Sequence, residues 1–346
     1  MHEIKFINRV PELKALRDWC AKQRTTPLYI YGPEGCGKTR LLREFIKKFN
    51  EYFGDDAIAV YIDALERSSV EKAILTSRSV KLATETLEKI IEKFSGLSVG
   101  RILAESITSI LEKAIIKKKL EDNYILIAID DITRALGLQQ IEWYIKWLYE
   151  LLWKIREEYR PKAINIIVTT SEGTSLKLVS RHRHAHITLL WNLPKEAFKE
   201  LFHELKPPNN TEFEQVWKLL GGNPGRLIEL AEEYNWNLEK WLNNLMKRLK
   251  PLAEEIARRG LIKELKQLIE DPDNVWYKAS PKIGELYDLL VENNVFMYKG
   301  FTTLNETEIP KDPELGIGQD YTWQIPAYRY ILDKLLKNKT TTPTQT

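Results

Sequence analysis

One short stretch of the chain combines glycines, a lysine and a threonine at a spacing that suits phosphate binding. It runs from Gly32 to Thr39 and fits the pattern G-x-x-x-x-G-K-[ST], known as Walker A. Glycines let the backbone curl so that several N–H groups point at one anion. Lys38 can reach the β- and γ-phosphates of a nucleoside triphosphate, and the Thr39 hydroxyl can ligate Mg²⁺. The stretch therefore predicts a phosphate-binding loop.

Most of this loop, and the residue that follows it, is expected to contact the nucleotide. An apolar strand ends at Tyr31, just before the loop, and a helix opens near Lys38, so the positive end of the helix dipole adds to anion binding. The residues of this stretch that we expect to bind nucleotide are Gly32, Pro33, Gly35, Cys36, Gly37, Lys38, Thr39 and Arg40.

A second candidate is an acidic pair at the end of an apolar run. Residues 124–129 read Tyr-Ile-Leu-Ile-Ala-Ile, and Asp130 and Asp131 follow directly. Ligands of open α/β sheets bind at the carboxyl ends of the strands. Asp130 is therefore expected to hold Mg²⁺ together with Thr39, in the Walker B role, and Asp131 to polarise the attacking water. The alternative is a buried strand that ends in two solvated acids.

The elements that must position these residues alternate between helices and strands. Apolar spacing predicts a helix from about Val10 and another from Arg40 to Phe49, and residues 57–62 read as a second buried strand. Such alternation implies an α/β fold with a parallel sheet covered on both faces. Residues 64–119 also show helical spacing and are expected to form a helical insertion without assigned chemistry.

The second half of the chain is expected to add two smaller domains. The run Gly221-Gly222-Asn223-Pro224 closes one helix and starts the next. Beyond residue 250, two helical stretches precede a strand pair with a long polar connection, which is the outline of a winged helix. We expect an ATPase-type core at 1–192, a helical lid at 193–249, a winged-helix-like domain at 250–338 and a disordered tail at 339–346.

Composition indicates a globular protein of the reducing cytoplasm. Of 346 residues, 29% are charged and 43% hydrophobic, and the net charge is only +3, which does not by itself indicate nucleic-acid binding. Two cysteines cannot build a disulfide framework. Long apolar runs are missing, so we expect neither a signal peptide nor a membrane-spanning segment.

Five stretches together resemble the archaeal ATPase family, STAND-type relatives of the AAA+ P-loop NTPases. They are the F-x-N-R entry at 6–9, the phosphate loop, the Asp130–Asp131 pair, the Gly221–Pro224 turn and the run Tyr-Thr-Trp-Gln-Ile-Pro-Ala-Tyr at 321–328. The resemblance covers nearly the whole chain. It implies a P-loop core with a five-stranded parallel sheet, a helical lid, a winged helix, and binding of ATP or ADP with Mg²⁺. It supplies no biological role.

The resemblance also implies roles for single residues around the nucleotide. The backbone at Asn8 and Arg9 would line the adenine pocket, and Pro224 would pack on adenine. A hydroxyl at the end of the strand near 163–171 would touch the γ-phosphate or the water. Thr170 is the expected residue, and Thr169 or Ser171 could serve instead.

The segment implied to carry an arginine finger has competing interpretations. Arg181 or Arg183 falls where related ATPases place such an arginine, and Arg181 is the expected one. Surface basic residues are the alternative. Three histidines at 182, 184 and 186 alternate in the same segment, but no acid or cysteine joins them and the spacing of a zinc site is missing.

These features predict an ATP-binding switch in which slow hydrolysis alters how the winged helix packs. Asp131 stands where many related ATPases have Glu, and the shorter side chain favours slow turnover. The alternatives are a DNA-binding ATPase and a nucleotide-binding scaffold that hardly hydrolyses. The candidate recognition helix carries Glu285, Asp288 and Glu292, with Lys282 as its main basic residue, which disfavours contact with DNA phosphates. An unidentified protein is the expected partner.

Overall fold

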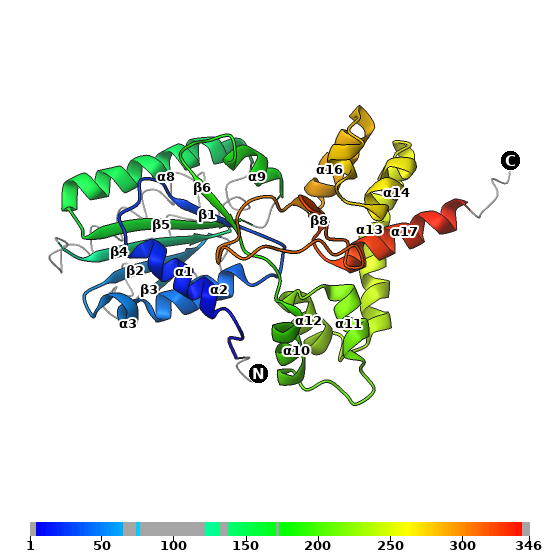
Figure 1. Ribbon diagram of the computed structural model, residues 1–346, viewed down its shortest axis with the longest axis horizontal. Helices are drawn as coiled ribbons and strands as arrows, with labels where there is room; N and C mark the ends of the chain where they lie inside the picture. Colours follow the sequence, from blue (N-terminus) through cyan, green and yellow to red (C-terminus); the bar gives the residue numbers. More distant parts are fainter. Residues whose placement is uncertain (1–4, 65–73, 77–121, 132–137, 171–172, 341–346) are drawn as a thin grey trace, which may run out of the picture.

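A six-stranded sheet forms the centre of the N-terminal part of the molecule (Figure 1). The structure is a computed structural model and describes residues 5–64, 74–76, 122–131, 138–170 and 173–340. The strand order is β3-β2-β4-β5-β1-β6; β3 pairs antiparallel with β2, and the other pairs are parallel. The strands are β1 (Leu28–Tyr31), β2 (Ile58–Asp63), β3 (Ile74–Thr76), β4 (Tyr124–Asp130), β5 (Ala163–Thr170) and β6 (His186–Leu189).

The sheet corrects two expectations about its edge. It has six strands rather than the expected five, because β3 adds to β2 with reversed direction. This strand lies inside the segment 64–119 that the sequence predicts to be helical, so the helical prediction is wrong for residues 74–76. Three residues give almost no periodic signal, and pairing with β2 decides their conformation. The rest of 64–119, apart from Ala64, lies outside the described residues.

Helices cover both faces of the sheet, as the alternation predicts (Figure 1). One face carries α1 (Val10–Cys20), α2 (Lys38–Lys47) and α3 (Phe49–Phe53), and the other carries α8 (Leu138–Tyr159) and α9 (Gly173–Val179). Neighbouring strand residues alternate between these two hydrophobic clusters, because successive side chains of a strand point to opposite faces. Strands buried on both faces explain the continuous apolar runs in the sequence.

A helical region follows β6 and contains a small second sheet. Its helices are α10 (Lys195–Glu204), α11 (Phe213–Leu220), α12 (Pro224–Glu232), α13 (Leu238–Arg258), α14 (Ile262–Glu270), α15 (Asn274–Tyr277), α16 (Pro281–Glu292) and α17 (Pro326–Thr340). The strands β7 (Phe296–Tyr298) and β8 (Tyr321–Trp323) pair antiparallel and are joined by a long loop. Residues 341–346, most of the expected tail, lie outside the described residues.

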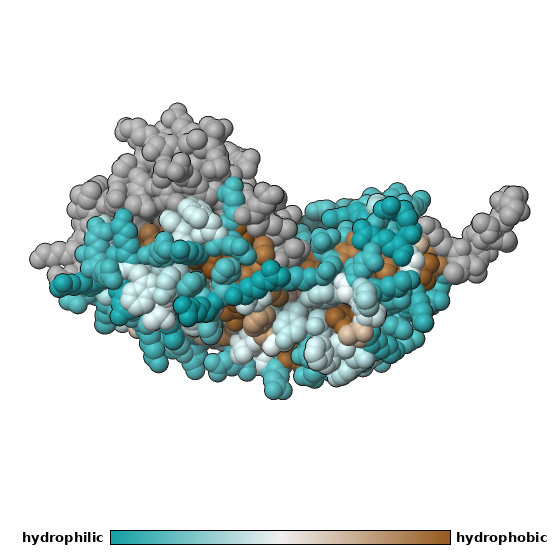
Figure 2. Space-filling view, turned by 90° about the horizontal axis from the view of Figure 1, so that it is seen from above, coloured by the Kyte–Doolittle hydropathy of each residue, from teal (hydrophilic) through white to brown (hydrophobic). Residues whose placement is uncertain are grey.

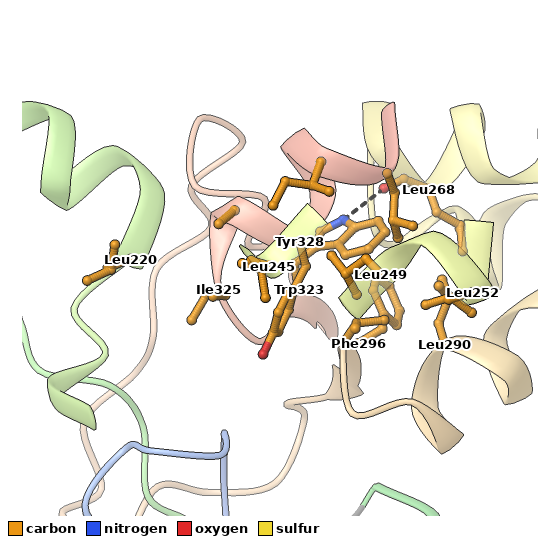
Figure 3. Packing of buried hydrophobic residues seen from close by; sticks show 14 of the residues in the cluster. Leu220, Leu245, Leu249, Leu252, Leu268, Leu290, Phe296, Trp323, Ile325 and Tyr328 are labelled. Carbon is orange, nitrogen blue, oxygen red and sulfur yellow. Dashed lines mark hydrogen bonds between the residues drawn. The ribbon is translucent and has the colours of Figure 1, made fainter. Parts of the chain in front are cut away.

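One hydrophobic core joins the region expected to be a lid with the C-terminal region. The cluster runs from Leu193 to Leu336, and the indole of Trp323 lies within it (Figure 3). Trp323 Nε1 donates a hydrogen bond to the carbonyl of Leu268, 3.4 Å away. The expected boundary at residue 250 falls inside α13, which continues over Pro251. Burial of the apolar face of α13 on both sides of this proline offsets the lost backbone hydrogen bond.

The long loop between β7 and β8 is tied to the edge of the large sheet. Leu189 N–H donates to the carbonyl of Thr302 (3.0 Å), and Leu304 N–H donates to the carbonyl of Leu189 (2.8 Å). Thr303 forms a parallel bridge with Leu189, so residues 302–304 extend the sheet beyond β6. The C-terminal region therefore contacts the core through backbone pairing.

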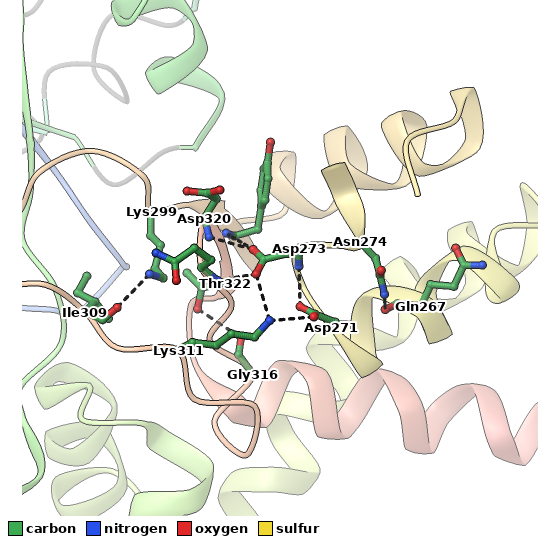
Figure 4. Close-up of polar contacts among 12 residues, drawn as sticks. Gln267, Asp271, Asp273, Asn274, Lys299, Ile309, Lys311, Gly316, Asp320 and Thr322 are labelled. Atoms are coloured by element: carbon green, nitrogen blue, oxygen red, sulfur yellow. Dashed lines mark hydrogen bonds and ion pairs between the residues drawn. The ribbon is translucent and has the colours of Figure 1, made fainter. Parts of the chain in front are cut away.

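A buried carboxylate organises the same loop from the other side (Figure 4). Asp273 accepts hydrogen bonds from the backbone N–H groups of Gln319, Asp320 and Tyr321, and Lys311 Nζ lies 3.4 Å from it. Burial alone would raise the pKa of Asp273, but these donors and the Lys311 charge outweigh it and hold the pKa below the ordinary value.

Hydrophilic residues dominate the surface of the face in Figure 2. The hydrophobic residues visible there form several small patches among the hydrophilic ones. Among the described helices, none combines the length and the apolar character that a membrane span requires.

Candidate nucleotide-binding site

The predicted phosphate loop connects β1 to α2 and has the backbone that its glycines permit. Gly35 and Gly37 have φ values of +83° and +102°, which favour glycine. A Cβ at Gly32 would lie 2.0 Å from the carbonyl oxygen of Leu190, so this position also requires glycine. The α2 helix begins at Lys38, and its N-terminal N–H groups face the loop interior.

The side chain of Lys38 lies over the loop and is almost fully buried. Its ammonium donates to the carbonyls of Gly32 and Pro33, each 2.9 Å away, and the Cys36 sulfur lies 3.7 Å away. These contacts place a positive charge beside the N–H groups that curl around the anion site. Lys38 and the loop amides can therefore act on the same phosphate.

Arg9 supports the loop through its side chain. The guanidinium donates to the carbonyls of Cys36 (2.8 Å) and Trp191 (2.7 Å) and pairs with Glu12 at 2.9 Å. Arg9 is buried, whereas Asn8 is exposed and adopts a φ of +45°. The sequence singled out this pair for its backbone. The side-chain role of Arg9 adds a brace between the loop and the segment after β6.

The carboxylate of Asp130 lies at the carboxyl end of β4 and is 2% exposed. It accepts a hydrogen bond from Tyr61 Oη at 2.8 Å and another from the hydroxyl of Thr169. Burial and the neighbouring Asp130 raise the pKa of Tyr61, so this phenol remains a donor. Asp131 has a φ of +49°, and its N–H donates to Thr169 Oγ1 at 3.1 Å.

The structure assigns the two threonines at the end of β5 to different faces of the sheet. Thr169 contacts the acidic pair, as just described, while Thr170 Oγ1 lies 2.7 Å from Ser175 Oγ at the start of α9. Successive strand side chains alternate, so only one of the two can face Asp130. Thr169, which the sequence left as an alternative, is the threonine whose hydroxyl contacts Asp130. Ser171 lies outside the described residues.

The oxygen donors at this end of the sheet suit Mg²⁺. Thr39, half-buried at the second position of α2, carries a hydroxyl, and Asp130 carries a carboxylate fixed by two donors. Each carboxylate oxygen can accept a further bond, and Mg²⁺ prefers oxygen ligands from one or two such groups. In the described part of the chain, no group of three or more His, Cys, Asp and Glu side chains could hold a metal ion.

The expected adenine-side proline lies close to the phosphate loop. A Cβ built on Gly37 would be 4.0 Å from Pro224 Cγ. The turn around this proline also bonds to the loop, since Gly225 N–H donates to the carbonyl of Gly35 at 2.9 Å. A Cβ on Gly225 would lie 2.8 Å from the Cα of Gly35, so only glycine allows this approach.

Near the loop lie three buried amide side chains. Sequence reasoning did not assign them to the site. They are Asn192, Asn223 and Gln324, each at most 4% exposed. Asn223 and Gln324 belong to stretches noted for the family resemblance, but only the three-dimensional contact reveals what their side chains touch. Asn192 carried no signal in the sequence.

Arg181 lies away from the phosphate loop of its own chain. It is exposed in the turn between α9 and β6, and its neighbour His182 lies 3.7 Å from Glu142 of α8. This turn precedes the amino end of β6, while the phosphate loop follows the carboxyl end of the parallel strand β1. The three nearby histidines also diverge, because His184 packs on Tyr149 and the other two have separate neighbours.

Comparison with known proteins fits this geometry. A family model described as an ATPase domain predominantly from Archaea matches residues 6–230, which include the loop, the acidic pair and the Gly221–Pro224 turn. The chain belongs to this family. The archaeal ATPase resemblance that the sequence suggests is thereby confirmed.

Relatives and solved structures show more distant similarity. An uncharacterized ATP-binding protein of Pyrococcus abyssi is 26% identical over 286 residues, 75% of this chain and 81% of that protein. The chromosomal replication initiator protein DnaA of Spiroplasma citri is 23% identical over 339 residues, 92% of this chain and 66% of that protein.

Among solved structures, the ORC2 protein of Aeropyrum pernix, in ADPNP and ADP complexes, has a TM-score of 0.46 at 14% identity, covering 98% of this chain and 96% of that one. Domain III of the Thermotoga maritima replication initiation protein DnaA has a TM-score of 0.36 at 18% identity, covering 67% of this chain and 93% of that one. TM-scores of this size do not show that the folds are the same.

Proposed function

We propose that this archaeal-type ATPase is a nucleotide-dependent switch of the STAND type, which binds ATP with Mg²⁺ and hydrolyses it slowly. The observation that carries the proposal is the direct hydrogen bond between the phosphate loop and the Gly221–Pro224 turn region, from Gly225 N–H to the carbonyl of Gly35. Because the lid touches the loop backbone itself, a change in the loop on binding or loss of phosphate acts on the lid.

Binding is assigned to the phosphate loop and its surroundings. Lys38 would neutralise phosphate charge, supported by its two carbonyl contacts. Thr39 and Asp130 would hold Mg²⁺, which when bound would neutralise charge on the phosphate oxygens. The adenine would lie near Asn8, Arg9 and Pro224, which agrees with the position of the proline beside the loop.

Hydrolysis is assigned to the end of β4 and β5. Asp131 would orient the attacking water, and Thr169 would fix both acidic residues through its hydrogen bonds. An aspartate reaches less far than a glutamate, which supports slow turnover. An arginine finger is proposed only from a neighbouring molecule, because Arg181 lies away from the loop of its own chain.

The parts that move are proposed to be the core and one combined lid and C-terminal body. The shared core from Leu193 to Leu336 and the uninterrupted helix α13 support a single body beyond residue 192. Within it, helices α14 to α16 followed by the β7–β8 pair and its long loop support a winged-helix-like arrangement for residues 250–338.

DNA binding by this region is not favoured in the described conformation. A winged helix contacts a duplex through its recognition helix and its wing. Here the long loop between β7 and β8, which would be the wing and is called the wing loop below, is paired with β6. The helix α16 packs against α9, where Asp288 forms an ion pair with Lys177. Both elements face the core, and the helix is acidic. A steep loss of duplex affinity with rising salt would overturn this view.

Replacing Lys38 by alanine tests nucleotide binding. ATP affinity measured by calorimetry is expected to fall by about a hundredfold or more, since a charge-assisted contact to phosphate is removed. Lys47→Ala, an exposed lysine later in α2, is the matched control and should bind ATP like the wild type. Unchanged affinity in Lys38→Ala would sink the proposal.

Replacing Asp131 by asparagine separates hydrolysis from binding. Single-turnover phosphate release is expected to slow by about a hundredfold, because the group that orients the water loses its charge, while ATP affinity changes little. A wild-type chain that releases phosphate no faster than this variant would instead be a nucleotide-binding scaffold.

A further inference from the structure

The C-terminal strand β8 delivers a side chain to the phosphate loop. Gln324 directly follows β8, 290 positions after Glu34 in the sequence, and its Oε1 accepts a hydrogen bond from the backbone N–H of Glu34 at 3.0 Å. Gln324 is 3% exposed. This almost fully buried amide directs its acceptor oxygen at the loop.

The backbone carbonyl of Glu34 is bound by a side chain at the start of α12. Asn223 Nδ2 donates to the carbonyl of Glu34 at 2.9 Å and to Asn192 Oδ1 at 3.0 Å. Its own Oδ1 accepts the N–H of Arg226, which caps α12. Both polar groups of the Glu34 backbone are thus occupied by side chains from outside the loop.

A third amide closes the arrangement into a ring. Asn192 Nδ2 donates to the backbone carbonyl of Gln324 at 3.1 Å, so the connector after β6 links the lid turn to β8. Asn223 and Asn192 are 0% and 4% exposed. Hydrogen-bonded side chains in a buried polar network reinforce one another and make their surroundings more rigid. Here that arrangement fixes the orientation of the two peptide groups that flank Glu34 in the phosphate loop.

We propose that Gln324 is a positioning residue for phosphate binding: by holding the Glu34 N–H, it orders the loop so that the amides after Glu34 face the phosphates. The effect is one of preorganisation, since a loop already held in its binding conformation loses less conformational entropy when the ligand arrives. Nucleotide affinity then depends on the C-terminal region being docked. By linkage, bound nucleotide favours that docking. This inference rests on the proposed ATP binding.

Gln324→Met tests the proposal in the full-length chain, because methionine has similar length and no strong acceptor. The matched control is Thr322→Val in the adjoining strand β8, which loses buried hydrogen bonds to Gly316 and Trp323 but touches only the C-terminal region. ATP and ADP affinities of the glutamine variant are expected to fall about fivefold, the effect of one hydrogen bond, while adenosine competes as in the wild type. The control should bind ATP within about twofold of the wild type.

A second readout works without nucleotide. Amide hydrogen exchange of the peptide that contains Glu34 is expected to be faster in Gln324→Met and unchanged in Thr322→Val. If the methionine variant loses its cooperative thermal transition, Gln324→Asn, which keeps the amide but falls short by one methylene, replaces it and should show the same two changes.

The possible outcomes distinguish the two proposals. Unchanged ATP affinity and unchanged exchange in the Gln324 variants would overturn the positioning role while leaving ATP binding intact. An equal loss of adenosine and ATP affinity would also overturn it, because it would indicate a general structural defect. If the wild type binds no ATP, the proposed function fails, and the exchange comparison alone then decides whether Gln324 orders the loop.

Discussion

The two threonines that end β5 differ in what their hydroxyls can do for catalysis. Thr169 donates to Asp130 and accepts from the N–H of Asp131, whereas Thr170 lies beside Ser175 on the α9 side. We expect Thr169→Val to slow single-turnover phosphate release by about tenfold to a hundredfold, the effect of losing a hydrogen bond to a charged group. ATP affinity should change little.

Thr170→Val is the matched control, because it removes the same hydroxyl one residue later on the same strand. Its phosphate release is expected to stay within about twofold of the wild type. Should Thr170→Val slow the reaction more than Thr169→Val, the assignment of the two faces to catalysis and packing would be wrong.

For single residues, the sequence predicts which types of side chain the site needs better than it predicts which of two neighbouring residues supplies one. The glycine, lysine and acidic positions follow from local patterns, because each needs only its own loop or strand end. The choice between Thr169 and Thr170 depends on which face of β5 meets Asp130, and two hydroxyls in sequence carry no signal for that. Arg181 shows the same limit, since only the strand direction reveals that its turn lies away from the loop.

The loop between β7 and β8 depends on one carboxylate for its shape. Asp273 accepts hydrogen bonds from three backbone N–H groups. In Asp273→Asn, the amide NH₂ would be a donor placed against these backbone donors. We expect this variant to lose ~2 kcal/mol of stability at pH 7, the scale of a hydrogen bond to a charged group. Thermal unfolding at several pH values measures the loss.

The pH dependence of that loss has a definite sign. Because the pKa of Asp273 is lowered in the folded chain, its stabilisation is complete above the unfolded pKa of about 3.9 and is lost as the pH falls through the folded pKa. The gap between wild type and Asp273→Asn should therefore narrow below about pH 4. Asp320→Asn, an exposed carboxylate in the same loop, is the control and should show no such gap. A gap that is constant from pH 7 to pH 3 would contradict the role of the charge.

Elements with their own periodic signal are predictable, and elements made by pairing are not. The helix α2 and the buried strand β4 carry clear apolar patterns in the sequence. By contrast, β3 and residues 302–304 are extended only because a strand edge offers them partners. The docking of 302–304 joins residues more than a hundred positions apart, a distance at which no local pattern can report contact.

The whole molecule joins its nucleotide loop to the C-terminal region along two routes. One is the amide ring that ends at Gln324, and the other runs from the wing loop, where Asn305 Nδ2 lies 3.3 Å from Glu12 Oε1, through Arg9 to the carbonyl of Cys36. Both routes end on the phosphate loop. A switch built this way should couple the state of the nucleotide to the docking of the C-terminal body.

Amide hydrogen exchange can measure this coupling in the intact chain. Asp131→Asn is expected to hydrolyse ATP about a hundredfold more slowly than the wild type, so its ATP and ADP complexes compare the two states. We expect exchange at residues 302–304 and in α16 to differ between the complexes, because the backbone bond from Leu304 to Leu189 and the packing of α16 on α9 both depend on docking. The buried positions of α13 serve as the internal reference and should exchange equally, since they lie in the core of the C-terminal body.

Adding Lys38→Ala should abolish any difference, because nucleotide then no longer binds. Equal exchange at 302–304 and α16 in the two complexes would mean that the C-terminal body stays docked throughout the cycle, and the chain would then be an ATPase without the proposed switch.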